Sequence, residues 1–317
     1  MRVVVTDHTF PGLEQEQAAA QDAGAAFAAF QCKSAEAVAA AVAGADVAVV
    51  QFAPFGPAAA AAMRPGATVI RYGVGYDNID IAAARAAGLQ VGYVPDYCAD
   101  EVADHTAAAC LALLRKLPML DASVRRGEWA AVRVAAPLKP FADTVVGFFG
   151  LGQIGRAVLG RLRGFGFGFL AADPMLSAAD AAALGVEVTD AAALFRRADL
   201  ISLHAPATAQ TAGYVDAARL ATMQRHAMIV NSARGGLIVE ADLAAALQAG
   251  VIAGAALDVF RTEPLPADSP LRGAPNLLLT PHAAWYSQTA IGRLQALVAE
   301  DIARALRGQA PRKPVPL

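Results

Sequence analysis

Six short apolar runs in the second half of the chain each lead to a glycine turn or a polar side chain. The runs are 144–149, 167–172, 199–203, 227–230, 252–257 and 276–280. The positions that follow them are, in the same order, Gly150 to Gly152, Asp173, His204, Asn231 to Arg234, Asp258 and His282. Alternation of such runs with helix-forming stretches predicts a parallel sheet covered on both faces. Because such sheets bind ligands just outside the carboxyl ends of their strands, these residues should line one crevice.

The first hundred residues show the same alternation. Strands are expected at 2–6, 25–30, 46–51, 68–71 and 89–94, with alanine-rich helices at 13–23, 35–43, 57–63 and 81–87. A long helical stretch from Ala99 to Arg126, interrupted at Pro118, is predicted to lead into a new domain. The last predicted helix, 287–306, could pack back on the first domain. The 317 residues therefore predict an α/β protein in which residues 99–286 are inserted into a discontinuous domain of residues 1–98 and 287–317.

The composition excludes several classes of protein. Hydrophobic residues make up 56% of the chain, enough for two cores, so intrinsic disorder is excluded. The net charge is −2 and the basic residues are scattered, so no nucleic-acid partner is expected. Mean hydropathy is +0.41, but no apolar stretch reaches about 18 residues, and the run after Met1 is too short for a signal peptide. Cys32, Cys98 and Cys110 lack metal-ligand spacing and are odd in number, so we expect a cytoplasmic protein with neither disulfides nor bound metal.

The first strand end carries the pattern G-x-G-x-x-G at Gly150, Gly152 and Gly155. The pattern follows a predicted strand and opens a predicted helix, and Asp173 stands eighteen residues after its last glycine. The glycines permit a tight turn and close approach of a pyrophosphate to the helix N-terminus, while a carboxylate accepts hydrogen bonds from a ribose diol. Asp173 would repel a 2′-phosphate and Pro174 brings no cation, so the sequence predicts NAD rather than NADP.

His282 is the candidate acid–base residue. It follows Thr280-Pro281 at a predicted strand end, and Glu263, nineteen residues earlier, is available as the partner that such a histidine needs. Arg234 stands at another strand end, where its guanidinium could clamp a carboxylate. Taken singly, Arg234 could equally be a surface ion-pair partner and Glu263 a solvated loop residue. Their joint placement beside a dinucleotide-binding motif favours catalysis. Surface or satisfied core positions are expected for three other histidines: His8, His105 and His226.

Five segments together resemble the NAD-dependent D-isomer-specific 2-hydroxyacid dehydrogenases. They are 71–80 (RYGVGYDNID), 150–155 (GLGQIG), 231–236 (NSARGG), 256–260 (ALDVF) with Glu263-Pro264, and 280–282 (TPH). The motifs occur in the family's order and span nearly the whole chain. The resemblance implies a Rossmann NAD-binding domain inserted into a discontinuous, flavodoxin-like substrate domain.

The resemblance also implies functions for individual residues. Arg234 would hold the substrate carboxylate, His282 would shuttle a proton and Glu263 would pair with His282. The backbone of Val74 and Gly75 would complete the carboxylate site. Contacts with NAD would come from the glycine loop and the strand ends: Gly150, Gly152, Gln153, Ile154, Gly155, Asp173, His204, Ala205, Pro206, Ala233, Arg234, Asp258, His282 and Ala284.

The segment after His282 departs from the small residues that many family members carry there. It reads Ala283-Ala284-Trp285-Tyr286-Ser287 and resembles the C-terminal-binding-protein branch, whose animal members are NAD(H)-binding transcriptional corepressors. Trp285 would either form a wall of the substrate pocket or pack in the core between the domains.

These observations predict an enzyme that reduces a 2-oxo acid or oxidises the matching D-2-hydroxy acid, resembling glyoxylate or hydroxypyruvate reductases or phosphoglycerate dehydrogenase. The alternative is an NAD(H)-sensing interaction protein with little turnover. Formate enzymes of this superfamily pair the histidine with glutamine, so Glu263 counts against a formate- or phosphite-handling relative. The apolar stretch Ala99–Leu120, together with the resemblance, predicts a homodimer formed through the nucleotide domains.

Overall fold

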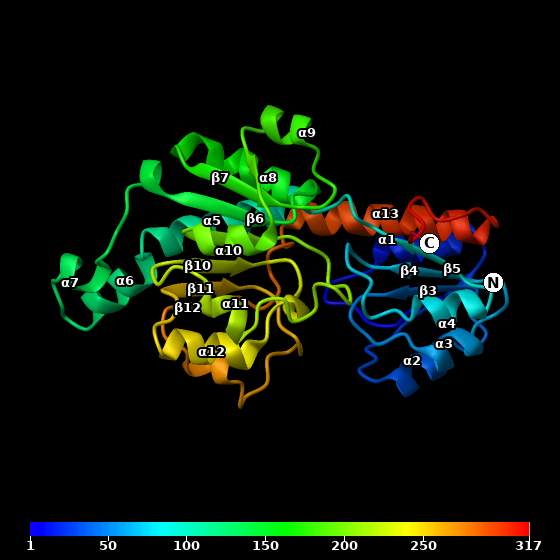
Figure 1. The fold of residues 1–317 in the computed structure, drawn as a ribbon. Helices are drawn as coiled ribbons and strands as arrows, with labels where there is room; N and C mark the ends of the chain where they lie inside the picture. Colours follow the sequence, from blue (N-terminus) through cyan, green and yellow to red (C-terminus); the bar gives the residue numbers. More distant parts are fainter. Residues whose placement is uncertain (317) are drawn as a thin grey trace. The chain divides into compact units, whose positions relative to one another are not determined.

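The computed structural model describes residues 1–316 and contains two parallel β-sheets (Figure 1). Contacts divide the chain into two compact units, one formed by residues 1–98 with 286–316 and the other by Ala99–Trp285. The second unit is therefore inserted into the sequence of the first. The expected α/β class, with two parallel sheets and one discontinuous domain, is confirmed.

The first unit contains a five-stranded sheet in the order β2-β1-β3-β4-β5, with every neighbouring pair parallel. Its strands are β1 (Arg2–Val5), β2 (Ala26–Ala29), β3 (Val47–Val50), β4 (Thr68–Arg71) and β5 (Gln90–Tyr93). Its helices are α1 (Glu14–Asp22), α2 (Ala35–Val42), α3 (Pro57–Ala62), α4 (Ile81–Ala86) and α13 (Gln288–Leu306). Helix α13 begins at the N-cap Ser287, whose hydroxyl accepts from the Ala290 N–H, and it packs against α1. The last helix thus returns to the first domain, as its position in the sequence suggested.

The second unit contains a seven-stranded sheet in the order β12-β11-β10-β9-β6-β7-β8. Its strands are β6 (Val145–Phe149), β7 (Gly168–Ala172), β8 (Glu187–Val188), β9 (Leu200–Leu203), β10 (Met228–Asn231), β11 (Gly254–Leu257) and β12 (Leu277–Leu279). Its α-helices are α5 (Ala99–Leu114), α6 (Leu117–Arg125), α7 (Ala131–Ala135), α8 (Gln153–Leu162), α9 (Ala178–Ala183), α10 (Ala191–Arg197), α11 (Ala217–Ala221) and α12 (Glu240–Gln248). The strand order reverses direction between β6 and β9, as in dinucleotide-binding folds, and that reversal is where such sheets bind their ligands.

Both faces of the second sheet are buried. In β9, Leu200 belongs to the apolar cluster that contains residues of α5 and α8, whereas Ile201 and Leu203 belong to the cluster that contains residues of α10 and α12. Because a strand covered on both faces needs apolar side chains at successive positions, the sequence shows continuous apolar runs and no alternation along each strand.

One local prediction was wrong, and one strand was missed. The helical stretch after Ala99 breaks at Lys116, which has a left-handed backbone (φ 52°), and not at Pro118. Pro118 instead lies in the first turn of α6, where its missing N–H would have no helical partner in any case. The edge strand β8 was not predicted because it comprises only Glu187 and Val188, both exposed, and so carries no apolar run.

Residues 1–316 lack two features, a helix that could span a membrane and a cluster of metal ligands. None of the helices there is long and apolar enough to cross a membrane. The same residues contain no group of three or more His, Cys, Asp or Glu side chains that could hold a metal ion.

Candidate active site

The polar residues predicted in the second half of the chain lie at one edge of the second unit's sheet. Each follows the carboxyl end of a strand, and all paired strands of this sheet are parallel, so their carboxyl ends share that edge. The edge therefore carries the glycine loop after β6, Asp173 after β7, His204 after β9, and the segments around Arg234 and His282.

The glycine loop requires glycine for steric reasons. Gly150 has a left-handed backbone (φ 88°), and a Cβ there would lie 2.8 Å from the backbone nitrogen of Ala205. At Gly152, which precedes α8, the position that a Cβ would occupy faces open space, with no atom of any residue beyond its two chain neighbours within 4 Å. The backbone at the start of α8 is thus open to close approach, and the N–H groups of its first turn can receive a pyrophosphate. This geometry fits NAD.

Asp173 connects the end of β7 to the glycine loop. Its Oδ2 accepts a hydrogen bond from the Leu151 N–H (2.7 Å) and its Oδ1 accepts one from the Met175 N–H (2.8 Å). A carboxylate has about four acceptor positions, so Asp173 retains acceptor capacity for the hydroxyls of a ribose.

His204 is an uncharged group at the same edge. Its Nε2 lies 2.8 Å from the Ser202 hydroxyl, and its ring stacks on Phe148 with the centroids 5.9 Å apart. Burial lowers the pKa of His204 to about 4, so the imidazole is neutral at physiological pH. It can contribute a hydrogen bond or an apolar surface to a cofactor, but no positive charge.

The turn that carries Arg234 is held by the buried side chain of Asn231. That amide donates to the Arg234 carbonyl (2.8 Å) and accepts from the Ala233 N–H (3.1 Å). A Cβ on Gly235 would lie 1.9 Å from the carbonyl carbon of Phe260, so only glycine lets this turn pass so close to the segment before Glu263. Arg234 directly precedes this glycine, and its charge contributes to lowering the pKa of the Glu263 carboxyl.

His282 and Glu263 form an ion pair when the histidine is protonated. Nδ1 of His282 lies 2.7 Å from Oε2 of Glu263, and Oε1 of Glu263 accepts from the Phe260 N–H (2.9 Å). Burial alone would raise the pKa of the Glu263 carboxyl. The hydrogen bond from His282, the charge of that residue, the Phe260 N–H and the charge of Arg234 together hold the pKa below its usual range. Glu263 is therefore an anionic partner that holds Nδ1 of His282, which is the arrangement that a proton-transferring histidine requires.

The carboxylate of Asp258 supports the turn on which His282 sits. It is 3% exposed, and it accepts hydrogen bonds from the Thr280 hydroxyl (2.6 Å), the Ala283 N–H (2.8 Å) and the Ala284 N–H (2.9 Å). These bonds stabilise the left-handed backbone of His282 (φ 51°). The contacts expected between NAD and Asp258 or Ala284 stay predictions.

The remaining predicted substrate residues lie in two places. Val74 and Gly75 follow β4 in the first unit, in a loop tied to the neighbouring one by Asn78, whose amide donates to the carbonyls of Gln51 (3.4 Å) and Ala53 (2.9 Å). Trp285 is half-buried at the end of the second unit. The two alternatives for Trp285, pocket wall or core, stay predictions.

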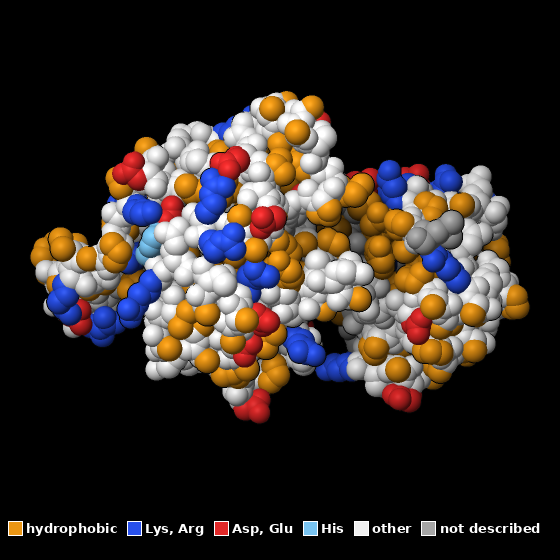
Figure 2. All heavy atoms as spheres, in the orientation of Figure 1, with side chains coloured by type: hydrophobic (Ala, Val, Ile, Leu, Met, Phe, Trp, Pro, Cys, Tyr) orange, Lys and Arg blue, Asp and Glu red, His pale blue; other side chains and the backbone are white. Residues whose placement is uncertain are grey.

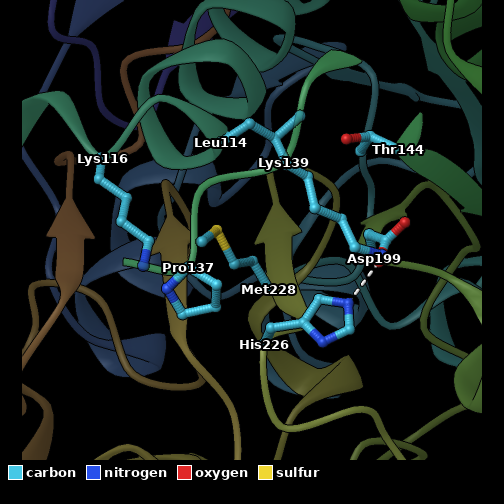
Figure 3. Close-up of a pocket in the computed structure, with 8 residues that line it drawn as sticks. All are labelled: Leu114, Lys116, Pro137, Lys139, Thr144, Asp199, His226 and Met228. Carbon is cyan, nitrogen blue, oxygen red and sulfur yellow. Dashed lines mark hydrogen bonds and ion pairs between the residues drawn. The ribbon is translucent and has the colours of Figure 1, made fainter. Parts of the chain in front are cut away.

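A cavity of about 140 Å³ opens at the opposite, amino edge of the second sheet. Figure 3 shows the side chains of Lys139 and His226 directed at Asp199, which they contact at 2.7 and 2.5 Å. The histidine has a charged partner, in keeping with its expected structural character. Thr144, which directly precedes β6, and Met228, the first residue of β10, also line the cavity. The other ends of these strands carry the predicted site, so this cavity is not the candidate active site.

Two contacts at the candidate site were missed by sequence reasoning. Nε2 of His105 lies 3.2 Å from the Thr280 hydroxyl, and the Thr106 hydroxyl lies 2.5 Å from that of Ser232. Their partners stand 175 and 126 residues further along the chain, so no local pattern could have revealed them.

Comparison with known proteins agrees with this geometry. Residues 107–284 match the family model described as the NAD-binding domain of D-isomer-specific 2-hydroxyacid dehydrogenases. The chain is 41% identical over 240 residues to D-3-phosphoglycerate dehydrogenase of Methanocaldococcus jannaschii, covering 75% of this chain and 45% of that protein. It is 37% identical over 248 residues to glyoxylate reductase of Korarchaeum cryptofilum, covering 77% of this chain and 74% of that protein.

A solved structure, that of the TT0316 protein from Thermus thermophilus, superposes with a TM-score of 0.86 at 29% identity and covers 100% of both chains. The chain spans about half the length of the phosphoglycerate dehydrogenases it matches. The two curated relatives are a dehydrogenase and a reductase, so they lend no support to the corepressor branch suggested by the segment around Trp285.

Proposed function

Because the chain belongs to the D-isomer-specific 2-hydroxyacid dehydrogenase family and carries its NAD-binding domain, we propose that it interconverts a 2-oxo acid and the D-2-hydroxy acid. The observation that carries this proposal is the pairing of His282 with Glu263 beside Arg234, at the same sheet edge as the glycine loop.

Three side chains would carry out the chemistry on the substrate. Arg234 binds the carboxylate and orients the 2-oxo carbon. Protonated His282 donates its Nε2 proton to the substrate oxygen during reduction, and neutral His282 accepts that proton during oxidation. Glu263 stabilises the imidazolium through Nδ1. NAD, when bound, supplies or accepts the hydride. The part assigned to the backbone of Val74 and Gly75 in the first unit stays a prediction.

Contacts with the cofactor are proposed at the glycine loop and at the strand ends. The pyrophosphate would lie at the start of α8, near Gly152, Gln153 and Ile154, and the adenosine ribose would bond to Asp173. Asp173 would repel a 2′-phosphate, which supports NAD over NADP.

The substrate is proposed to be a small 2-oxo acid, as the name of the glyoxylate reductase relative suggests, or the substrate of a phosphoglycerate dehydrogenase. The test is NADH consumption with glyoxylate, hydroxypyruvate, 3-phosphohydroxypyruvate, pyruvate, phenylpyruvate and a thioether 2-oxo acid. Turnover with at least one of them is expected. Tight NADH binding with no turnover on any of them would favour the alternative, an NAD(H)-sensing protein.

A homodimer formed through the second unit is also proposed. Large apolar side chains are exposed on and around α6 and α7, among them Val124 (55%), Trp129 (94%) and Val132 (82%). Figure 2 shows hydrophobic side chains gathered at the outer end of this segment. Exposed apolar side chains concentrated on one segment are typical of a protein interface. A cytoplasmic location stays a prediction.

A further inference from the structure

Two consecutive residues of α5 contact the two segments that carry Arg234 and His282. His105 contacts Thr280, which stands two residues before His282, and Thr106 contacts Ser232, which stands two residues before Arg234. One helix turn therefore contacts both parts of the candidate site.

The hydrogen bonds around Thr280 have a defined direction. The Thr280 hydroxyl donates its single proton to Asp258 Oδ1 (2.6 Å), so at 3.2 Å it accepts from the N–H of His105 Nε2. The same nitrogen lies 3.8 Å from Asp258 Oδ1. Asp258 in turn accepts from the backbone N–H groups of Ala283 and Ala284. His105 is thus connected through two side chains to the turn that carries His282.

The second contact has an equally defined direction. The Thr106 hydroxyl donates to the Val102 carbonyl within α5 (2.6 Å), so it accepts from the Ser232 hydroxyl. Thr106 is fully buried, and Ser232 is the neighbour of Asn231, whose amide closes the turn of Arg234. The bond from Ser232 therefore fixes that turn to α5.

Helix α5 is a rigid support for both contacts. Its buried side chains, which include Ala103, Ala107 and Cys110, belong to the core beneath the sheet, and the helix packs against α8 and over β9, β10 and β11. Consecutive residues of a helix are about 1.5 Å apart along its axis, so the two contacts are held at a fixed separation.

We propose that His105 and Thr106 are positioning residues that together set the relative placement of the His282 imidazole and the Arg234 guanidinium. The inference rests on the proposed function of these two groups. A small misplacement of an orienting group is expected to weaken catalysis strongly even when the fold persists.

The kinetic test compares two substitutions that should act mainly on different constants. Thr106→Val keeps the shape of the side chain and removes the acceptor for Ser232, so KM for the 2-oxo acid should rise about fivefold. Its kcat should also fall, but by less than in His105→Leu, because a shifted Arg234 misplaces the reacting carbon. His105→Leu removes the donor to Thr280, so kcat should fall about tenfold with little change in KM. The NADH dissociation constant should change less than these kinetic constants in either variant. Thr106→Ser and His105→Gln, which restore an acceptor and a donor, should recover most of each loss.

The matched control is Thr144→Val. Thr144 is also a buried threonine whose hydroxyl donates to a backbone carbonyl, that of Pro140 (2.8 Å), but it lies at the amino edge of the same sheet. The control should lower the melting temperature and leave kcat and KM unchanged. Equal losses in kcat and KM for all three variants would mean that each merely destabilises the fold, and would overturn the proposal.

A double-mutant cycle tests the contact between Thr106 and Ser232 directly. Ser232→Ala should reproduce the rise in KM of Thr106→Val, and the double variant should be no worse than either single variant. Additive losses would show that the two hydroxyls act independently and would overturn this half of the inference. If Thr106→Val fails to fold, the Ser232→Ala variant by itself still tests this contact through its effect on KM.

Hydrogen exchange provides a readout that needs no turnover. The amides of Ala283 and Ala284 donate to Asp258, and the amide of Ala233 donates to Asn231. His105→Leu should speed exchange at the first two, and Thr106→Val should speed exchange at the third. Absence of turnover in the wild type would contradict the proposed function but would leave the positioning inference standing. Unchanged exchange at these amides would contradict the positioning inference, whatever the substrate.

Discussion

Nδ1 of His282 and Oε2 of Glu263 lie 2.7 Å apart, although nineteen residues separate them in the chain. Asp258 holds the backbone on the histidine side of this pair, and the Phe260 N–H holds the glutamate. An ion pair whose two members are each fixed by separate hydrogen bonds is suited to keep one imidazole nitrogen aimed at a substrate.

Glu263→Gln should shift the pH range that supports 2-oxo acid reduction to more acidic values. Reduction needs protonated His282, and loss of the anionic partner destabilises the imidazolium, so the proton dissociates at lower pH. The measurement is kcat/KM against pH. Glu240→Gln is the matched control, since the Glu240 carboxylate accepts a hydrogen bond from the N–H of Arg261, which lies in the same segment as Glu263. Superimposable profiles for Glu263→Gln and the wild type would show that Glu263 is not the partner of His282.

His282→Ala and Arg234→Ala should differ in their kinetic signatures. Loss of the proton donor should lower kcat at least about 100-fold and leave NADH affinity nearly unchanged. Loss of the guanidinium should raise KM for the 2-oxo acid and also lower kcat, because a misaligned carboxylate misplaces the reacting carbon. Steady-state kinetics and NADH fluorescence titration separate the two. Arg261→Ala, at an exposed position, should behave as the wild type. A His282→Ala variant with normal kcat would rule out its assignment as the acid.

The catalytic efficiency of the wild type should be at least about tenfold higher with NADH than with NADPH, a difference of 1.4 kcal/mol. Asp173→Ala should reduce that preference. Removing the carboxylate would remove both the proposed bond to the ribose and the proposed repulsion of a 2′-phosphate. NADH affinity should also fall, since Asp173 holds the Leu151 N–H in the glycine loop. Asp180→Asn is the control on the adjacent helix α9. Equal catalytic efficiency of the wild type with both cofactors would refute the assignment.

Asp199→Asn should destabilise the protein at neutral pH by about 2 kcal/mol, because Lys139 and His226 lose a buried anionic partner. Burial would raise the pKa of Asp199, but the bonds from Lys139, the Val145 N–H and His226, with the charge of Lys139, hold it below its usual value of 3.8. The carboxylate therefore stabilises the fold above pH 3.8, and its contribution is lost as the pH falls through the lower, folded value. Denaturant unfolding measured at pH 7 and at successively lower pH should show the difference between variant and wild type unchanged down to about the usual value of 3.8 and shrinking only below it. The exposed Asp121→Asn should change stability little at any of these pH values.

Light scattering at micromolar concentration should give about twice the chain mass of 32.5 kDa. Trp129→Asp should shift the mass towards the monomer, because it places a charge among the exposed apolar side chains of the α6–α7 segment. Met175→Asp, at a position that is 88% exposed elsewhere in the same unit, should leave the mass unchanged. A monomeric wild type would remove the proposed dimer.

Several features of the site were predictable because their physical cause is local. The glycine loop needs a left-handed backbone at Gly150, and strand ends are marked by the change from apolar to polar residues, as at Asp173 and His204. Burial of both sheet faces produces continuous apolar runs, so the positions of most strands along the chain could be predicted from the sequence, but their order in the sheets could not. The two-residue strand β8 was missed because it lies at an edge, where no burial is required.

The sequence by itself determined the α/β class, the discontinuous first domain, the dinucleotide motif and the candidates Arg234, Glu263 and His282. Only the tertiary structure decided how these groups are held: that Asp258 supports the turn of His282, that Gly235 passes against Phe260, and that α5 contacts both segments through His105 and Thr106. The physical reason is that backbone conformation and burial leave a signal within a few residues, whereas a hydrogen bond between distant segments depends on where the packed core brings them.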